Sequence, residues 1–225
     1  MYNYLLSIAA VFIGTLIVIL FKPSNQKNLK LLLAFSGAFL LAITIFDLLP
    51  EIFEDNPFAK RTGAWIMIGI LLQKILEYFS KGAEHGHIHL DKETISVPKL
   101  LFISLGIHAI LEGFPIHHTD GILLGIIIHK IPIAMILATF LMNTKISKPI
   151  IALLLIVFAL MTPLGTFISE NFSSIHKYYK EINALVIGIF LHVSTTILFE
   201  SNEGHKFNIT KLLVILAATV IAYLL

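Results

Sequence analysis

Long apolar segments alternate with short polar connectors along the whole chain. A helix rises about 1.5 Å per residue, so about 20 apolar residues cross the hydrocarbon core of a membrane. Connectors such as residues 22–25 (Lys-Pro-Ser-Asn) carry turn-forming and helix-breaking residues. The pattern predicts eight membrane-spanning helices, at residues 3–21, 31–50, 62–80, 99–117, 121–142, 148–168, 182–200 and 210–225.

The composition agrees with this pattern and excludes other classes of protein. Hydrophobic residues make up 57% of the chain and charged residues 13%, whereas soluble domains have about 45–50% and about 25%. The chain contains no cysteine, which excludes a disulfide scaffold and any thiolate metal ligand. A net charge of +2, scattered along the chain, does not favour nucleic acid as a partner. We therefore predict an all-α polytopic membrane bundle, with residues 1–225 forming a single transmembrane domain.

Basic residues predict the orientation of this bundle. Ten lysines lie in one set of connectors: Lys22, Lys27, Lys30, Lys81, Lys92, Lys99, Lys145, Lys148, Lys206 and Lys211. The other set carries four basic residues: Lys60, Arg61, Lys177 and Lys180. Loops rich in Lys and Arg stay in the cytoplasm. Both termini are therefore expected outside the cytoplasm, and the loop of residues 81–98 inside it.

Two segments of the chain resemble each other. Residues 37–44 (GAFLLAIT) and residues 188–195 (GIFLHVST) share four of eight positions. In the predicted topology these segments cross the membrane in opposite directions, as inverted repeats of transporters do. Chance similarity between two apolar helices is the alternative.

Ionisable residues inside the predicted spans need a partner or a function, because a charge in mid-membrane costs at least a few kcal/mol. The spans contain Asp47, Lys74, Glu77, His108, Glu112, His129, Lys130 and His192. Lys74 and Glu77 are three residues apart, which predicts an ion pair on one helix face. A role of Glu77 in an ion pathway is the alternative. For His192 we expect a hydrogen bond to a neighbouring helix, or a role as a fourth metal ligand.

His108, Glu112 and His129 are the strongest candidates for a metal site. His108 and Glu112 are four residues apart and share a helix face. His108 and His129 both lie about 12–13 Å from the predicted outer ends of their spans. The short connector predicts that the two helices pack with axes about 8–10 Å apart. Two imidazoles and a carboxylate suit Zn²⁺, and also Fe²⁺ or Mn²⁺. Hydrogen-bonded structural histidines are the alternative.

Proline residues lie close to these candidates. Pro115 and Pro132 follow the two histidine-bearing segments. Each removes a backbone donor and leaves a carbonyl one turn upstream without its helical partner. We therefore expect a kink beside a cavity in each of the two spans.

The chain resembles the ZIP family of divalent-metal transporters. The family's span-four signature is met by His108, Glu112 and Gly113, and its span-five signature by His129 and Pro132. Residues 48–51 (Leu-Leu-Pro-Glu) and residues 163–165 (Pro-Leu-Gly) also fit family patterns. The resemblance implies eight spans, both termini outside and a metal path between spans four and five.

Four residues depart from the family pattern: Ala109, Lys130, Ile133 and Ala134. The resemblance implies a second, adjacent metal position that needs an Asn and an acid where Ala109 and Lys130 stand. We expect that position to be absent, with the Lys130 ammonium in its space and paired with Glu112 or another acid. The first position would keep three ligands and lose the one at residue 133.

Further polar residues flank the predicted site. An acidic, histidine-bearing outer mouth is predicted at Asp47, Glu51, Glu54, Asp55, His117, His118 and Asp120. Such a field raises the local cation concentration, although a solvated loop surface is the alternative. On the cytoplasmic side, His85, His87 and His89 form a short histidine-rich tract that would receive or sense metal. An ordinary polar loop is the alternative there.

These features together predict a transporter that carries a divalent metal ion, Zn²⁺ first, into the cytoplasm. The chain is not expected to be an enzyme. The expected partners are the metal ion and the lipid bilayer, with a homodimer left open. One alternative is an intramembrane zinc hydrolase, which the lack of a His-Glu-x-x-His pairing disfavours. A second is a transport-inactive, metal-sensing relative in which Lys130 blocks the path.

Overall fold

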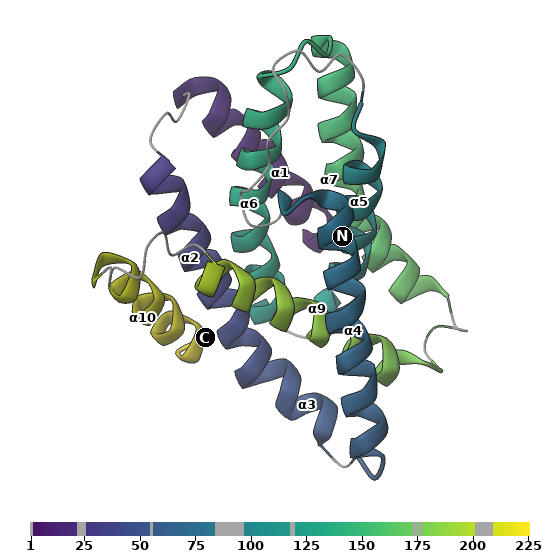
Figure 1. Ribbon diagram of the computed structural model, residues 1–225. Helices are drawn as coiled ribbons and strands as arrows, with labels where there is room; N and C mark the ends of the chain where they lie inside the picture. The colour runs from purple at the N-terminus through teal and green to yellow at the C-terminus, as the bar shows by residue number, and fades with distance from the viewer. Residues whose placement is uncertain are drawn as a thin grey trace.

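The computed structural model describes residues 2–21, 26–54, 56–83, 97–117, 120–172, 175, 177–200 and 209–225. Within these ranges every regular element is a helix (Figure 1). The α-helices are α1 (Tyr2–Phe21), α2 (Gln26–Ile43), α3 (Leu49–Phe53), α4 (Ala59–Ser80), α5 (Lys99–Glu112), α6 (Asp120–Met142), α7 (Lys148–Asn171), α9 (Tyr179–Glu200) and α10 (Ile209–Tyr223). A π-helical turn, η1 (Thr44–Leu48), joins α2 to α3, and a 3-10 turn, η3 (Phe114–His117), follows α5.

Among the described residues, five helices are long and apolar enough to cross a membrane, which supports a helical membrane protein. They cover Tyr2–Phe21, Asn28–Phe53, Gly121–Met142, Lys148–Asn171 and Tyr179–Phe199. The other three predicted spans also form helices. However, α5 has 14 residues and α10 has 15, and α4 carries the charges of Lys60, Arg61, Lys74 and Glu77. The crossing of the membrane by all eight stays a prediction.

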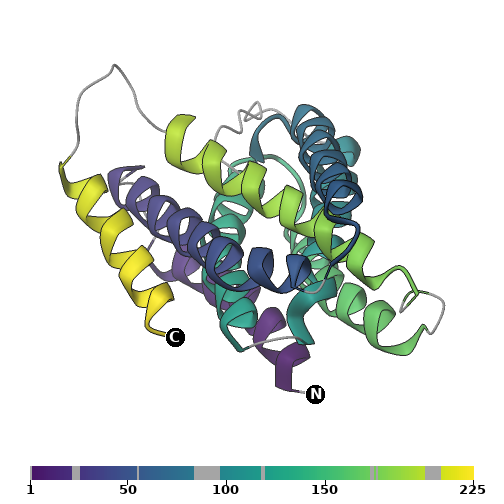
Figure 2. The ribbon, with the colours of Figure 1, turned by 90° about the horizontal axis from the view of Figure 1, so that it is seen from below.

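The helices form two groups, α1, α2 and α6 in one and α4, α5 and α7 in the other, which meet where α1 packs against α7. Helix α6 packs against α1 and α2, while α5 packs against α4 and α7 (Figure 1). Helix α9 contacts both α4 and α2, and α10 lies beside α2 at the edge of the bundle (Figure 2). The sequence predicts that α5 and α6 pack with axes about 8–10 Å apart, and the structure meets this prediction only in part. Their backbones rarely approach each other, and large polar side chains join them instead.

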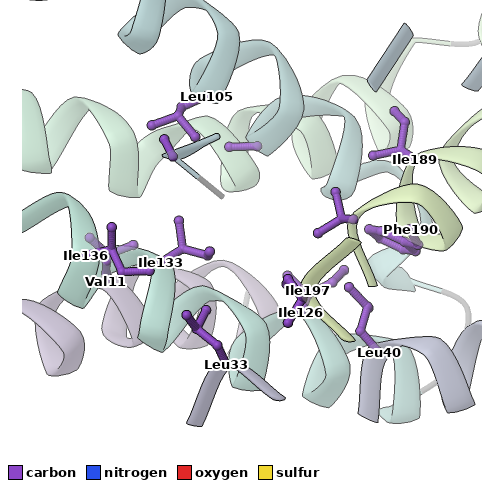
Figure 3. Packing of buried hydrophobic residues seen from close by; sticks show 14 of the residues in the cluster. Val11, Leu33, Leu40, Leu105, Ile126, Ile133, Ile136, Ile189, Phe190 and Ile197 are labelled. Carbon is purple, nitrogen blue, oxygen red and sulfur yellow. The ribbon is translucent and has the colours of Figure 1, made fainter. Parts of the chain in front are cut away.

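The apolar core surrounds α6. Figure 3 shows Ile126, Ile133 and Ile136 of this helix among buried residues from α1, α2, α5 and α9. Of the five long apolar helices, α6 has the largest buried share and α1 the smallest. Any ionisable residue on the inner face of α6 therefore lies in the interior of the bundle.

Glycine allows close approach at three helix crossings, one of them where Gly14 of α1 lies against the carbonyl oxygen of Ile131 in α6. A Cβ added to Gly165 of α7 would overlap the carbonyl oxygen of Ile110 in α5, and one on Gly113 would overlap that of Thr162. At the crossing of α4 and α9, a Cβ on Gly188 would overlap the carbonyl oxygen of Ile66. Small residues let membrane helices approach to backbone contact. The contacts of Gly113 and Gly165 bring the end of α5 directly against α7.

Helix α5 ends earlier than predicted. The sequence predicts one span to residue 117, kinked near Pro115, but the α-helix stops at Glu112 and continues as η3. Pro115 has no N–H and disfavours α-helical geometry at the residue before it. The carbonyl of Gly113 accepts a hydrogen bond from the Thr166 hydroxyl (2.9 Å), and that of Phe114 from the Ser169 hydroxyl (3.1 Å). Hydroxyl groups of α7 thus donate hydrogen bonds to two carbonyls that would have no partner in lipid.

The second predicted span is longer than expected and contains a π-helical turn. The sequence predicts its end at residue 50, but helix continues to Phe53. Pro50 lies in the first turn of α3, where its missing N–H is tolerated. Asp47 belongs to η1, so it lies six residues before the helix end rather than close to it. Turns of this type are frequent at functional sites.

Candidate functional site

A cluster of buried polar side chains lies between α5, α6 and α7. Helix α5 contributes His108 and Glu112, α6 contributes His129 and Lys130, and α7 contributes Thr162. Each of these residues is at most 4% exposed. The structure therefore buries the three predicted metal ligands together with a lysine and a threonine; His108 lies next to Glu112, and the His129 ring lies next to that of His108.

The Glu112 carboxylate is the centre of this cluster. Its Oε1 accepts hydrogen bonds from the Lys130 ammonium and, at 2.7 Å, from the Thr162 hydroxyl. Its Oε2 lies 3.5 Å from Nε2 of His108. The prediction that the Lys130 ammonium pairs with Glu112 is confirmed. A buried carboxylate at this depth requires such a partner.

The Lys130 ammonium has two further contacts, both on α7. It donates to the Thr162 hydroxyl, and it lies 4.8 Å from the centroid of the Phe158 ring. A cation over an aromatic face is stabilised by the ring quadrupole, more strongly when water is excluded. The ammonium is thus held by a carboxylate, a hydroxyl and an aromatic ring.

The two histidines lie side by side. Their ring centroids are 6.3 Å apart and the ring planes are inclined by 71°. Nδ1 of His108 lies 3.0 Å from the amide oxygen of Gln73 in α4. Because an amide oxygen only accepts, Nδ1–H must be the donor. In a neutral ring, Nε2 then presents its lone pair toward Glu112, which is how a metal-binding histidine is oriented by a second residue.

The metal site itself stays a prediction. Among the residues that the structure describes, no three His, Asp or Glu side chains come close enough together to hold an ion. In the structure as it stands, Glu112 is engaged by the Lys130 ammonium. Ile133 occupies its position as a buried core residue (Figure 3), so α6 supplies no ligand one turn after His129.

A second polar cluster joins α4 to α9. Oε2 of Glu77 accepts a hydrogen bond from Nε2 of His192 at 2.7 Å and lies 3.1 Å from the Lys74 ammonium. The predicted ion pair between Lys74 and Glu77 is confirmed. The expected hydrogen bond from His192 to a neighbouring helix is also confirmed, with Glu77 as the acceptor.

The residues of the predicted outer mouth are described only in part. Asp47 is half-buried, while Glu51 and Glu54 are exposed. Asp55 and His118 lie outside the described residues, as do the side chains of His117 and Asp120. His85, His87 and His89 also lie outside them. The outer mouth and the cytoplasmic metal-binding loop therefore stay predictions.

Three residues of the two clusters were missed by the sequence analysis: Gln73, Phe158 and Thr162. Each is uncharged, and only ionisable residues within the spans were considered as candidates. Gln73 had one usable signal, because it stands one helical turn before Glu77 on the same predicted face. Nothing in the sequence around Phe158 and Thr162 indicates that they face Lys130.

Replacing Thr162 with valine is expected to lower the free energy of unfolding by about 1–3 kcal/mol, because Glu112 and Lys130 each lose a buried hydrogen-bond partner. Denaturant or thermal unfolding in detergent measures the loss. The matched control is Thr219→Val in α10, which removes a hydroxyl that bonds its own helix at Ile215 and should change little. Equal losses in both variants would contradict a role for Thr162 in the cluster.

The fold and the interior cluster together define a helical membrane protein with an ionisable centre. Comparison of the chain with models of known protein families gives no match, and comparison with curated proteins gives none either. The resemblance to the ZIP family therefore rests on the sequence motifs alone.

Proposed function

We propose that this protein is a ZIP-like membrane transporter that carries a divalent metal ion, Zn²⁺ first, toward the cytoplasm. The observation that carries the proposal is the burial of two imidazoles and a carboxylate, from α5 and α6, in the interior of a membrane bundle. Ionisable groups at such a position mark ion pathways. Their nitrogen and oxygen donors match the preferences of Zn²⁺, Fe²⁺ and Mn²⁺.

The geometry around Glu112 supports this reading. Two ligand atoms on a tetrahedral zinc ion, with bonds of about 2.1 Å, are separated by about 3.4 Å. Nε2 of His108 and Oε2 of Glu112 are 3.5 Å apart, which is long for a hydrogen bond. The tautomer of His108 that Gln73 selects directs the Nε2 lone pair toward Glu112, where an ion would bind. His129 would complete the site after a small rearrangement.

Lys130 would act as a resident cation in the transport cycle. While no metal is bound, its ammonium neutralises Glu112 and removes the cost of a bare buried charge. A dication on Oε2 of Glu112 would repel the ammonium held at Oε1, and Thr162 together with the Phe158 ring provides a place for that ammonium on α7. The central site would thus alternate between a tethered cation and a transported one.

The proposal includes the predicted topology. Eight spans, inverted repeats and both termini outside the cytoplasm place Asp47 and Glu51 toward the outer end of the path. The two similar segments lie on α2 and α9, which pack against each other. Movement of the group formed by α4, α5 and α7 relative to the group formed by α1, α2 and α6 would expose the central cluster to each side in turn.

Replacing His108 or His129 with alanine is expected to reduce zinc uptake to background, because the central site loses a nitrogen ligand. Uptake of ⁶⁵Zn²⁺ into proteoliposomes measures this, with the amount of inserted protein determined in parallel. Ser104→Ala is the control, because Ser104 is buried one turn before His108 and donates only along its own helix, to Leu100. Unchanged uptake in both histidine variants would refute the proposal.

A transport-inactive, metal-sensing relative is the second candidate function. The specific observation that favours it is the ion pair between Lys130 and Glu112, which occupies the proposed ligand. If the wild-type protein moves no zinc but Lys130→Glu does, this candidate is preferred. The hydrolase alternative has less support, because the residue after His129 is a cation rather than a carboxylate that could act as a base.

A further inference from the structure

A second carboxylate in the bundle has the same kind of surroundings as Glu112. Glu112 lies between the Lys130 ammonium and the His108 ring. Glu77 lies between the Lys74 ammonium, at 3.1 Å, and the His192 ring, at 2.7 Å. Each group thus combines a metal-binding oxygen, a metal-binding nitrogen and a tethered cation that holds the carboxylate.

Gln73 connects the two groups along α4. Its amide oxygen accepts from His108, and it precedes Glu77 by four residues, so both side chains lie on one face of the helix. Four residues correspond to about 6 Å of helix rise. An ion that leaves the central cluster along this face therefore meets Glu77 and His192 next.

The pair of Glu77 and His192 lies just beyond the glycine crossing of α4 and α9. His192 follows Gly188 by one turn, and Glu77 follows Gly69 by two turns; Gly69 and Gly188 are the residues at which the two backbones meet. Glu77 and His192 therefore meet within the long interface of α4 and α9, on one side of this close approach. Glu77 is also three residues from the end of α4 at Ser80, toward the proposed cytoplasmic connector.

We infer that Glu77 and His192 form a second metal site, through which the ion passes between the central cluster and the cytoplasm. This inference rests on the proposed transport function. The oxygen and nitrogen atoms are 2.7 Å apart; once Nε2 has released its proton to water, an opening to about 3.4 Å admits a tetrahedral dication between them. Only two protein ligands are supplied, so binding is weak and release is fast.

The exposure of these side chains fits a transit site. Glu77 is 11% exposed and His192 is 14% exposed, whereas the side chain of Lys74 is 61% exposed. Water can therefore complete the coordination of an ion between Glu77 and His192. The Lys74 side chain can move away from the carboxylate without repacking the bundle, because it lies on the outer surface of α4.

Zinc binding to the purified full-length protein in detergent tests the inference, by equilibrium dialysis and metal analysis. The wild-type protein is expected to bind two ions, one more weakly. His192→Gln should abolish only the weaker class, and His108→Ala only the tighter one. Lys74→Met should strengthen the weaker class several-fold, because the ammonium no longer competes for Glu77. A purely structural ion pair predicts no gain in zinc affinity from that variant.

The outcomes separate this inference from the proposed function. If neither His192→Gln nor Lys74→Met changes the number or the affinity of bound zinc ions, the second site is overturned, regardless of the result for His108→Ala. Binding that depends on His192 but not on His108 overturns the central site and leaves the second one standing. The Lys74 side chain is exposed, so Lys74→Met is expected to fold. This variant therefore still tests the second site if His192→Gln does not fold.

Transport kinetics test the position of the second site. In proteoliposomes, Glu77→Gln and His192→Gln are expected to lower kcat by about tenfold or more while KM for zinc changes by less than about twofold, since the central cluster still captures the ion. A raised KM with unchanged kcat would instead place the pair before the central cluster, and would overturn the assignment to the cytoplasmic side.

Discussion

Replacing Lys130 with methionine is expected to lower the free energy of unfolding of the metal-free protein by about 3–5 kcal/mol. Methionine has a similar length but no charge, so the variant leaves the Glu112 carboxylate buried without its ammonium. The Thr162 hydroxyl and the His108 ring remain as neighbours of Glu112, and neither replaces a full positive charge unless the ring is protonated. Thermal or denaturant unfolding in detergent, with a chelator present, measures the loss.

Zinc should restore much of the stability of the Lys130→Met variant. A dication that binds Glu112, His108 and His129 takes over the role of the ammonium, and binding at 100 times Kd stabilises a folded state by about 2.7 kcal/mol. The same variant should bind zinc more tightly than the wild-type protein, because the tethered competitor is gone.

The double variant Lys130→Met with Glu112→Gln is the control for this experiment. It removes both charges, so it should lose less stability than Lys130→Met alone, and zinc should not restore what it loses. The interpretation of Lys130 as a resident cation fails if Lys130→Met is as stable as the wild type in chelator. It also fails if zinc leaves the unfolding of that variant unchanged.

Replacing Gly165 with alanine is expected to separate α5 from α7 and to disrupt the central cluster. The new Cβ would overlap the carbonyl oxygen of Ile110, a backbone atom that no rotamer change can move. Overpacking of this kind costs about 1–3 kcal/mol or more. Because Thr162 lies one turn before Gly165, the separation also withdraws its hydroxyl from Glu112. Unfolding measurements and zinc uptake should therefore decline together.

Gly63→Ala in α4 is the matched control for the helix-crossing experiment. Nothing lies within 4 Å of a Cβ added at this position. Alanine is a better helix former than glycine, so the variant should be neutral or more stable by up to about 1 kcal/mol. If Gly165→Ala is as well tolerated as Gly63→Ala, the crossing of α5 and α7 does not position the cluster.

The sequence located the helices but not all of their boundaries: the predicted starts at residues 31, 62 and 182 fall three to five residues after the observed starts at Gln26, Ala59 and Tyr179. The predicted starts at residues 3, 121 and 148 lie within one residue of the observed starts at Tyr2, Asp120 and Lys148. The predictions were less accurate near prolines. Helix α5 stops before Pro115, and a π-helical turn carries the second span past Pro50 to Phe53. Pro50 lies in the first turn of α3, where its missing N–H is tolerated, whereas Pro115 lies after the end of its α-helix.

Some contacts within the candidate site were predictable from the sequence and others were not. The pair of Lys74 and Glu77 follows from spacing on one helix, and the pairing of Lys130 with Glu112 follows from the cost of burying either charge alone. The contacts of His108 with Gln73 and of His192 with Glu77 were not predictable as particular pairs. They join helices that are far apart in sequence, and several acceptors were equally compatible with the spacing.

The sequence by itself indicated a helical membrane protein, because an apolar run of about 20 residues spans the hydrocarbon core as a helix that satisfies its own backbone hydrogen bonds. It also determined which costly ionisable residues lie inside. Only the tertiary structure decided how those residues are grouped. Glycine contacts set how closely α5 meets α7 and α4 meets α9, and these approaches determine which donor reaches which carboxylate. Spacing along one helix contains no information about the rotation and depth of its neighbours.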